Sequence, residues 1–97
     1  MSQLPDIRAA LRLEHKPVEV GGVALLLRRP TVADLAAVLD MNERDPRRAN
    51  AALLCRHVLD AQGIAVWGSV EEAEQCPLHL AHGLVPLVEG LYAEGRD

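Results

Sequence analysis

Residues 17–29, which read PVEVGGVALLLRR, decide the fold class, because they predict a β-hairpin in a chain that is otherwise patterned for helices. Gly21 and Gly22 supply the positive φ angles that a two-residue hairpin turn requires. Valines on either side of Glu19 give the first arm the alternation of a strand with one buried face. The second arm is apolar on both sides, so we expect a helix or a partner to cover its second face.

A first helix is predicted directly after the hairpin. Thr31 is in the position of an N-cap, and Asp34 lies in the first turn, where the helix dipole favours a negative charge. Apolar residues then recur with the i, i+3, i+4, i+7 spacing of a helix that buries one face. This stripe consists of Val32, Leu35, Ala36 and Leu39, and the helix is expected to fade near residues 41–44.

A second helix is predicted to begin at Asp45 as the N-cap, with Pro46 at the first helical position. We expect it to end at about Asp60, where residues 60–63 predict a tight turn, since Gly63 adopts positive φ without steric cost. Its apolar stripe is Ala51, Leu54, Cys55 and Val58.

A short apolar crossing at residues 64–67 leads to a third predicted helix over residues 70–75. Its start is predicted by a capping box, in which the Ser69 hydroxyl accepts from the Glu72 N–H and the Glu72 side chain reaches back to Ser69.

The last helical region is predicted from Pro77 to about Ala93. A proline inside a helix removes a hydrogen bond and clashes with the preceding turn, so Gly83 and Pro86 predict a kink or two shorter helices. The apolar stripe of this region is Leu80, Leu84, Leu87, Val88 and Leu91.

At the other end of the chain, residues 5–13 predict a short helix with Leu4, Ile7 and Leu11 on one face. The sequence as a whole therefore predicts a single α+β domain over residues 1–97, mostly helical, with a short N-terminal β-hairpin. Its parts are an N-terminal segment (1–16), the hairpin (17–29) and helices within 31–93.

The charge of the chain is divided unevenly between its two halves. Residues 1–59 carry nine Arg or Lys against seven Asp or Glu, whereas residues 60–97 carry Arg96 alone against seven acids. This balance disfavours nucleic acid, which needs a positive face. It favours a protein partner with a basic patch, or self-association between the unlike halves.

The amino-acid composition disfavours several other classes of protein. Trp67 and Tyr92 are the only aromatic residues, so the core is built from Leu, Val and Ala, and a small-molecule pocket is disfavoured. The longest apolar run, residues 23–27, is too short to span a membrane, and the first residues lack the pattern of a signal peptide. Two distant cysteines favour free thiols in a reducing cytosol.

Candidate chemistry was sought among the cysteines, histidines and acidic residues. Cys76, His79 and His82, with Cys55 and His57, lack the paired ligand spacing of structural zinc sites. Cys55 and His57 point to different faces of a helix, so they do not form a nucleophile–base pair. Acids at the start of a helix are explained by its dipole, which accounts for Glu71, Glu72 and Glu74. We therefore predict no catalytic, cofactor-binding or metal-binding residues, and no enzyme activity.

Four residues are candidates for protein binding: Leu26, Arg28, Arg29 and Trp67. Trp67 is a side chain of the kind that anchors interfaces, although a place in the core is the simpler interpretation. The arginine pairs 28–29 and 47–48 have the charge to contact phosphates, but they lack interleaved aromatic residues, so solvated basic positions explain them more simply.

The order of these short motifs resembles that of the tail assembly chaperones of long-tailed, non-contractile bacteriophages and related gene-transfer particles. Those proteins show a short strand pair, an Arg followed by Thr-x-x-Asp, a later Asp-x-x-Gly and a Ser-x-Glu-Glu-Ala-like cap. Here the corresponding residues are Arg29 with Thr31-Val32-Ala33-Asp34, then Asp60-Ala61-Gln62-Gly63, then Ser69-Val70-Glu71-Glu72-Ala73. The resemblance covers about residues 17–92.

The resemblance implies a role in assembly. Such chaperones bind the tape measure protein, a very long and largely helical chain, keep it soluble, and give way as tail tube subunits polymerise around it. It further implies a homo-oligomer in the bacterial host cytoplasm, absent from the mature virion, with a longer frameshifted form recruiting the tube protein. The alternative is a small cytosolic regulatory or protein-binding module without catalytic activity.

Overall fold

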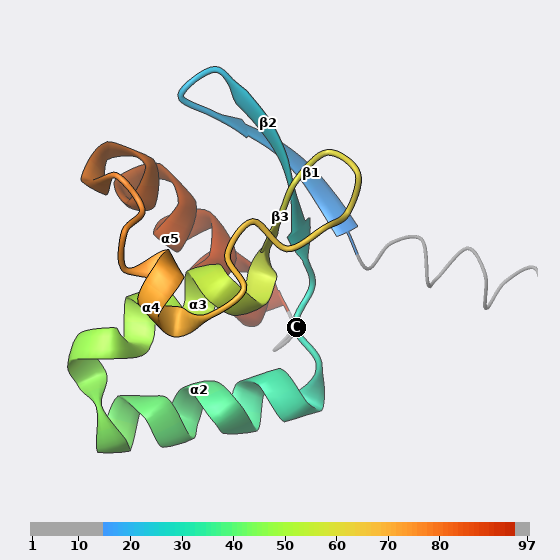
Figure 1. Cartoon of the computed structure of the whole chain (residues 1–97). Coiled ribbons are helices and arrows are strands. Elements are labelled where there is room, and N and C mark those ends of the chain that lie inside the picture. Colours follow the sequence, from blue (N-terminus) through green and yellow to red (C-terminus); the bar gives the residue numbers. More distant parts are fainter. Residues whose placement is uncertain (1–14, 95–97) are drawn as a thin grey trace, which may run out of the picture.

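A computed structural model describes residues 15–94 and shows an α+β fold, mostly helical, with an N-terminal hairpin (Figure 1). The predicted fold class is confirmed. The predicted helix at residues 5–13 lies outside the described residues. The elements in chain order are β1 (His15–Val20), β2 (Val23–Arg28), α2 (Val32–Arg44), the 3₁₀-helix η1 (Pro46–Arg48), α3 (Ala49–His57), β3 (Val58–Leu59), α4 (Val70–Ala73) and α5 (Leu78–Glu94).

The hairpin forms around the predicted glycine turn. Gly21 and Gly22 have φ angles of 59° and 79°, and Val20 pairs with Val23 across them. In a two-residue hairpin this closing pair exchanges both backbone hydrogen bonds, and bonded and non-bonded pairs then alternate. Pro17, opposite Leu26, therefore falls at a non-bonded position, where its missing N–H faces away from β2.

The chain adds a third strand that the sequence analysis missed. The prediction that the second helix runs to about Asp60 is wrong, because α3 ends at His57 and Val58 is extended. Val58 and Leu59 then pair antiparallel with Leu27 and Leu26, which gives the sheet order β1-β2-β3. Both residues of β3 are buried, so burial against the core explains this early end of the helix.

The predicted turn after this helix is present but connects different elements. The Asp60 carboxylate accepts hydrogen bonds from the N–H groups of Gln62 and Ile64, and Gly63 has a φ of 85°. The chain then returns along β3, where Ala65 forms an isolated bridge with Leu59. The turn therefore connects β3 to the segment that runs back beside it, instead of following a helix.

Side-chain caps define the starts of two helices. At α2, Thr31 Oγ1 accepts from the Asp34 N–H and the Asp34 carboxylate accepts from the Thr31 N–H, which is a full capping box. At α4, Ser69 Oγ accepts from the Glu72 N–H as predicted, but the Glu72 carboxylate accepts from the Gly68 N–H instead of reaching Ser69. This helix ends at Ala73, two residues before the predicted end.

The predicted start at Asp45 and Pro46 is present only as a 3₁₀ turn. Asp45 is in the N-cap position of η1 and Pro46 is its first residue, but the Asp45 side chain makes no capping hydrogen bond and α3 starts at Ala49.

The apolar stripe predicted for α2 does not face the core, and this is the largest correction. Val32 is 87% exposed, Leu39 is 55% exposed and Leu35 is 43% exposed. The helix instead turns Asp34 inward, where this carboxylate is 2% exposed and is held by two arginines. Polar bonding of one buried carboxylate, rather than apolar periodicity, sets the orientation of α2.

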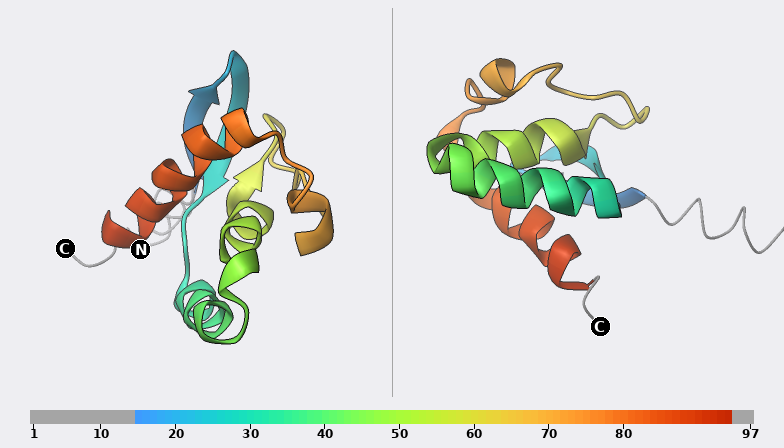
Figure 2. Two further views of the ribbon diagram at one scale, coloured as in Figure 1. Left: turned by 90° about the vertical axis from the view of Figure 1, so that its left-hand side faces the viewer. Right: turned by 90° about the horizontal axis from the view of Figure 1, so that it is seen from below.

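The helix α5 is a single helix with Pro86 inside it, so the second of the two predicted alternatives, two shorter helices, is wrong. Leu84, Val88 and Leu91 of its predicted stripe are buried, while Leu87 remains 37% exposed. Figure 2 shows α5 lying alongside the hairpin. The buried core combines α5 with β2, α3, β3 and α4, through Leu27, Leu53, Leu54, Val58, Ala73, Leu84, Val88 and Leu91.

Candidate functional site: an apolar trough along α5

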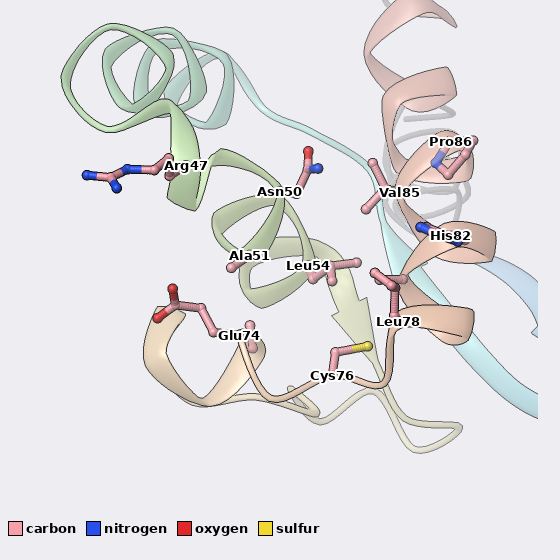
Figure 3. Close-up of a pocket in the computed structure, with 12 residues that line it drawn as sticks. Arg47, Asn50, Ala51, Leu54, Glu74, Cys76, Leu78, His82, Val85 and Pro86 are labelled. Atoms are coloured by element: carbon pink, nitrogen blue, oxygen red, sulfur yellow. The ribbon is translucent and has the colours of Figure 1, made fainter.

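A cavity of about 490 Å³ opens between α3, α4 and the first half of α5 (Figure 3). Figure 3 shows Leu54 of α3 and Leu78 and Val85 of α5 between the polar side chains of Arg47, Asn50, Glu74 and His82. Its wall is therefore apolar with polar groups at the rim, as in sites that bind an apolar segment by shape. The lining residues are Arg47, Asn50, Ala51, Leu54, Ala73, Glu74, Cys76, Leu78, Ala81, His82, Val85 and Pro86.

A second cavity of about 330 Å³ lies between α2, α3 and the second half of α5. It shares Asn50 with the first cavity. Its lining is Leu35, Val38, Leu39, Asn42, Ala49, Asn50, Leu53, Glu89, Tyr92 and Ala93. Two of the exposed leucines of α2 therefore form one wall of this cavity.

The two cavities follow one face of α5 over its whole length. The residues that α5 contributes recur every three or four positions, which is the spacing of a single helix face. They are Leu78, Ala81, His82, Val85, Pro86, Glu89, Tyr92 and Ala93. At a rise of 1.5 Å per residue, the 17 residues of α5 span about 25 Å. We call these two cavities together the α5 trough.

Charged residues stand at the rim of both cavities. Arg47 lines the first cavity, is exposed, and has no ion pair with a carboxylate within residues 15–94. Glu74 lines the same cavity and pairs with Arg48 at 3.2 Å. Glu89 lines the second cavity and has no ion-pair partner in that same part of the chain. Each cavity therefore has one charged side chain at its rim that is not paired within the described residues.

Tyr92 is held in the wall of the trough by a buried histidine. His57 is fully buried, its Nδ1–H donates to the Arg28 carbonyl at 2.7 Å, and its Nε2 accepts from the Tyr92 hydroxyl. The two rings meet edge to face, with centroids 5.3 Å apart. Burial lowers the pKa of His57 and raises the pKa of Tyr92 to about 12, so both groups are neutral at pH 7. The last helix is thereby tied to the end of β2.

The α2 wall of the trough is held by Asp34. Arg28 donates to both of its carboxylate oxygens, at 2.8 and 2.9 Å, and Arg56 Nε donates at 3.1 Å. Burial by itself would raise the pKa of Asp34, but the hydrogen bonds from Arg28 and the Thr31 N–H lower it well below its usual range. The carboxylate is therefore ionised throughout the physiological range.

The candidate binding residues from the sequence do not line the trough. Leu26 is half-buried in β2 between Pro17 and Leu59, and Arg28 is engaged with Asp34. Arg29 donates to Glu94 at 2.7 Å at the end of α5. Trp67 is half-buried against the core in the loop before α4, where its carbonyl accepts a weak bond from the Cys55 thiol.

Cys76 and His82 both line the first cavity. Burial raises the pKa of the Cys76 and Cys55 thiols, which disfavours the thiolate needed for nucleophilic chemistry. Within residues 15–94, no group of three His, Cys, Asp or Glu side chains is arranged to hold a metal ion.

The trough was not predicted, because the sequence pattern assigns a single apolar stripe to α5. Leu78, Ala81 and Val85 lie outside that stripe, and they form the wall of the first cavity. The available signal was the surplus of apolar residues in this helix over what one buried face needs.

The described residues form a small α+β domain with an apolar trough along α5, long enough for a helical segment of several turns. Comparison of the chain with protein-family models, with curated proteins and with solved structures gave no significant match. None of the helices in the described part of the chain has both the length and the apolar character needed to cross a membrane.

Proposed function

We propose that this chain is a tail assembly chaperone that binds helical segments of a phage tape measure protein in the α5 trough. The observation that carries the proposal is the trough itself, two adjacent cavities with largely apolar walls on one face of α5, a helix about 25 Å long. The motif order around residues 29–34, 60–63 and 69–73 supports the choice of protein class.

A groove of this kind suits an amphipathic helix. Such a helix lays its apolar face into the groove and contacts it through residues at i, i+3, i+4 and i+7. Both cavities open to the surface, so a bound helix is expected to keep a solvated face and to leave without unfolding the domain. Many copies along a long partner then hold it through contacts that are individually weak but jointly strong.

The rim charges define the chemistry expected of the bound segment. Arg47 at the first cavity favours an acidic residue beside the apolar stripe, and Glu89 at the second cavity favours a basic one.

The proposed location, self-association and further partner follow from the assignment to the tail assembly chaperones. The protein acts in the bacterial host cytoplasm, forms oligomers on the tape measure protein and is absent from the mature virion. A longer frameshifted form recruits the tail tube protein. The function needs no cofactor, nucleic acid or membrane, and no catalysis.

A pull-down after co-expression, carried out at low and at high salt, tests the proposal. The tape measure protein is expected to be soluble and to retain this chain. The retention is expected to persist at high salt, because apolar contact depends on buried area. Leu78→Glu places a charge in the trough at a residue that is 69% exposed, so it is expected to abolish retention without unfolding the domain.

Ile64→Glu is the matched control. Ile64 is 65% exposed and lies in the turn after β3, outside the trough, so this variant is expected to retain the partner like the parent. If the tape measure protein stays insoluble and retains no parent protein at either salt, the chaperone assignment is wrong. The regulatory or protein-binding module is then the better assignment, and its partner is sought with the same two variants.

A further inference from the structure

The outer face of α2 is apolar, and no other element in residues 15–94 covers it. Val32 and Leu39 are 87% and 55% exposed, and the exposed Ala36 lies between them. Asp34 is on the opposite side of the helix, facing the two arginines that hold it. We call Val32, Ala36 and Leu39 the α2 outer face.

The spacing within this face is self-complementary. Val32 and Leu39 are seven residues apart, close to two helical turns, with Ala36 near the midpoint. When two copies of α2 pack antiparallel and cross at Ala36, Val32 of each copy meets Leu39 of the other. The same contact then forms twice, as in a two-fold symmetric interface. The small side chain of Ala36 allows the two helices to approach closely at the crossing point.

Charges at the ends of this face are complementary in the same arrangement. Glu43 lies one turn beyond Leu39, is exposed and has no ion pair within residues 15–94. Arg29 lies just before Val32 and remains 38% exposed although it bonds Glu94. Antiparallel packing brings Glu43 of one copy to the Arg29 end of the other, and opposes the two helix dipoles favourably.

We propose that the α2 outer face is a contact between two copies of this chain, which pair through antiparallel α2 helices. The face is much smaller than the roughly 800 Å² per partner of a stable complex, so the dimer is weak and forms with rising concentration. Leu39 also lines the second cavity of the α5 trough, whereas Val32 and Ala36 lie outside it, so a substitution at Val32 tests the pairing separately from the proposed binding of a tape measure helix.

Sedimentation of the full chain over a range of concentrations tests this pairing. The parent is expected to change from monomer to dimer, and Val32→Glu to weaken the dimer by roughly tenfold or more, because each dimer contains two copies of the substituted residue. Ile64→Glu makes the same chemical change at an exposed residue on a different element, and is expected to leave the dimer unchanged.

Exchanging the two charges distinguishes antiparallel pairing of the α2 helices from non-specific self-association. Glu43→Arg and Arg29→Glu are each expected to weaken self-association of the variant alone. Mixed together, they are expected to form a heterodimer as strong as the parent dimer, since both of its charged contacts are again between opposite charges. A mixture that associates no better than either variant overturns the proposed arrangement.

Two further results would also overturn the proposal. One is a parent that is monomeric at every concentration. The other is a Val32→Glu variant whose melting temperature falls while its oligomeric state is unchanged, which would place a segment of the same chain over the α2 outer face. If instead Val32→Glu keeps the tape measure pull-down but loses the dimer, the pairing is supported separately from the proposed function.

Discussion

At the scale of single residues, Asp34 joins three parts of the chain that are distant in the sequence. Its carboxylate receives hydrogen bonds from Arg28 of β2, Arg56 of α3 and the backbone at the start of its own helix. A buried carboxylate is tolerated only when its charge is compensated in this way. One side chain therefore sets both the start of α2 and the direction in which that helix faces.

Replacing Asp34 by Asn is expected to lower the free energy of unfolding by about 1.5–3 kcal/mol, the range for hydrogen bonds to a charged group. The cause is the loss of the negative charge that both arginines bind. Chemical denaturation measures the change.

Asp40→Asn is the control for this prediction. Asp40 pairs with Arg44 on the exposed side of the same helix, at 2.6 Å, and such pairs contribute about 0.3–0.5 kcal/mol. Equal losses for the two variants would contradict the role assigned to Asp34.

At the scale of elements, the hairpin and α5 meet at a glycine. A Cβ placed on Gly83 would lie 2.6 Å from Val20 Cγ1, so β1 and α5 approach too closely there for a larger residue. The helical pattern around Gly83 predicts only a weak point in a helix. Its role depends on β1, 63 residues earlier in the chain, and no local pattern within α5 contains that information.

Two glycine substitutions in this one helix are expected to have opposite effects. Gly83→Ala is expected to destabilise the protein, because Val20 or the strand must shift to make room. Gly90→Ala is expected to stabilise it by about 0.5–1 kcal/mol, because nothing lies within 4 Å of a Cβ there and alanine favours the helix. Melting temperatures of the two variants give the comparison, and the same sign for both would contradict the close approach.

At the scale of the whole molecule, His57 connects the sheet to α5. The charged or titratable groups around it come from all the elements packed there: Arg28 from β2, Asp34 from α2, Arg56 from α3 and Tyr92 from α5. Burial disfavours the charged imidazolium, and protonation of Nε2 would remove the acceptor of the Tyr92 hydroxyl, so the folded protein favours the uncharged form.

Stability is therefore expected to fall as the solution is acidified below the ordinary histidine pKa of 6.5. Burial lowers the pKa of His57 in the folded state, so the unfolded chain binds the proton more readily, and the stabilisation present above pH 6.5 is lost as the pH decreases. The loss contributed by Asp34 comes at lower pH, below its ordinary pKa of 3.8.

Melting temperatures between about pH 7.5 and pH 5.5 measure this effect, and His79→Gln, at an exposed position, is the control that keeps the same profile. NMR titration of the imidazole of His57 gives a direct check. A value at or above 6.5 for this histidine would contradict the prediction.

Features that depend on neighbouring residues could be predicted from the sequence, whereas features that depend on contacts between distant residues could not. The glycine turn at residues 21–22, the caps at Thr31 and Ser69, and the turn at residues 60–63 each depend on neighbouring residues, and each was found from the sequence. The strand β3, the orientation of α2 and the trough depend on what packs against them. Periodicity identified the apolar residues of α2 and α5 but not which of them the rest of the chain would cover.

Pro17 has a consequence for how copies of this protein can meet. It lies in the middle of β1, at a position where a backbone N–H would point away from β2, on the side of the sheet that no strand within residues 15–94 pairs with. Lacking that donor, β1 offers an incoming strand an interrupted ladder, and proline at such a position is a known defence against edge-to-edge aggregation. Pro17 therefore disfavours amyloid-like stacking of one hairpin on another through this edge.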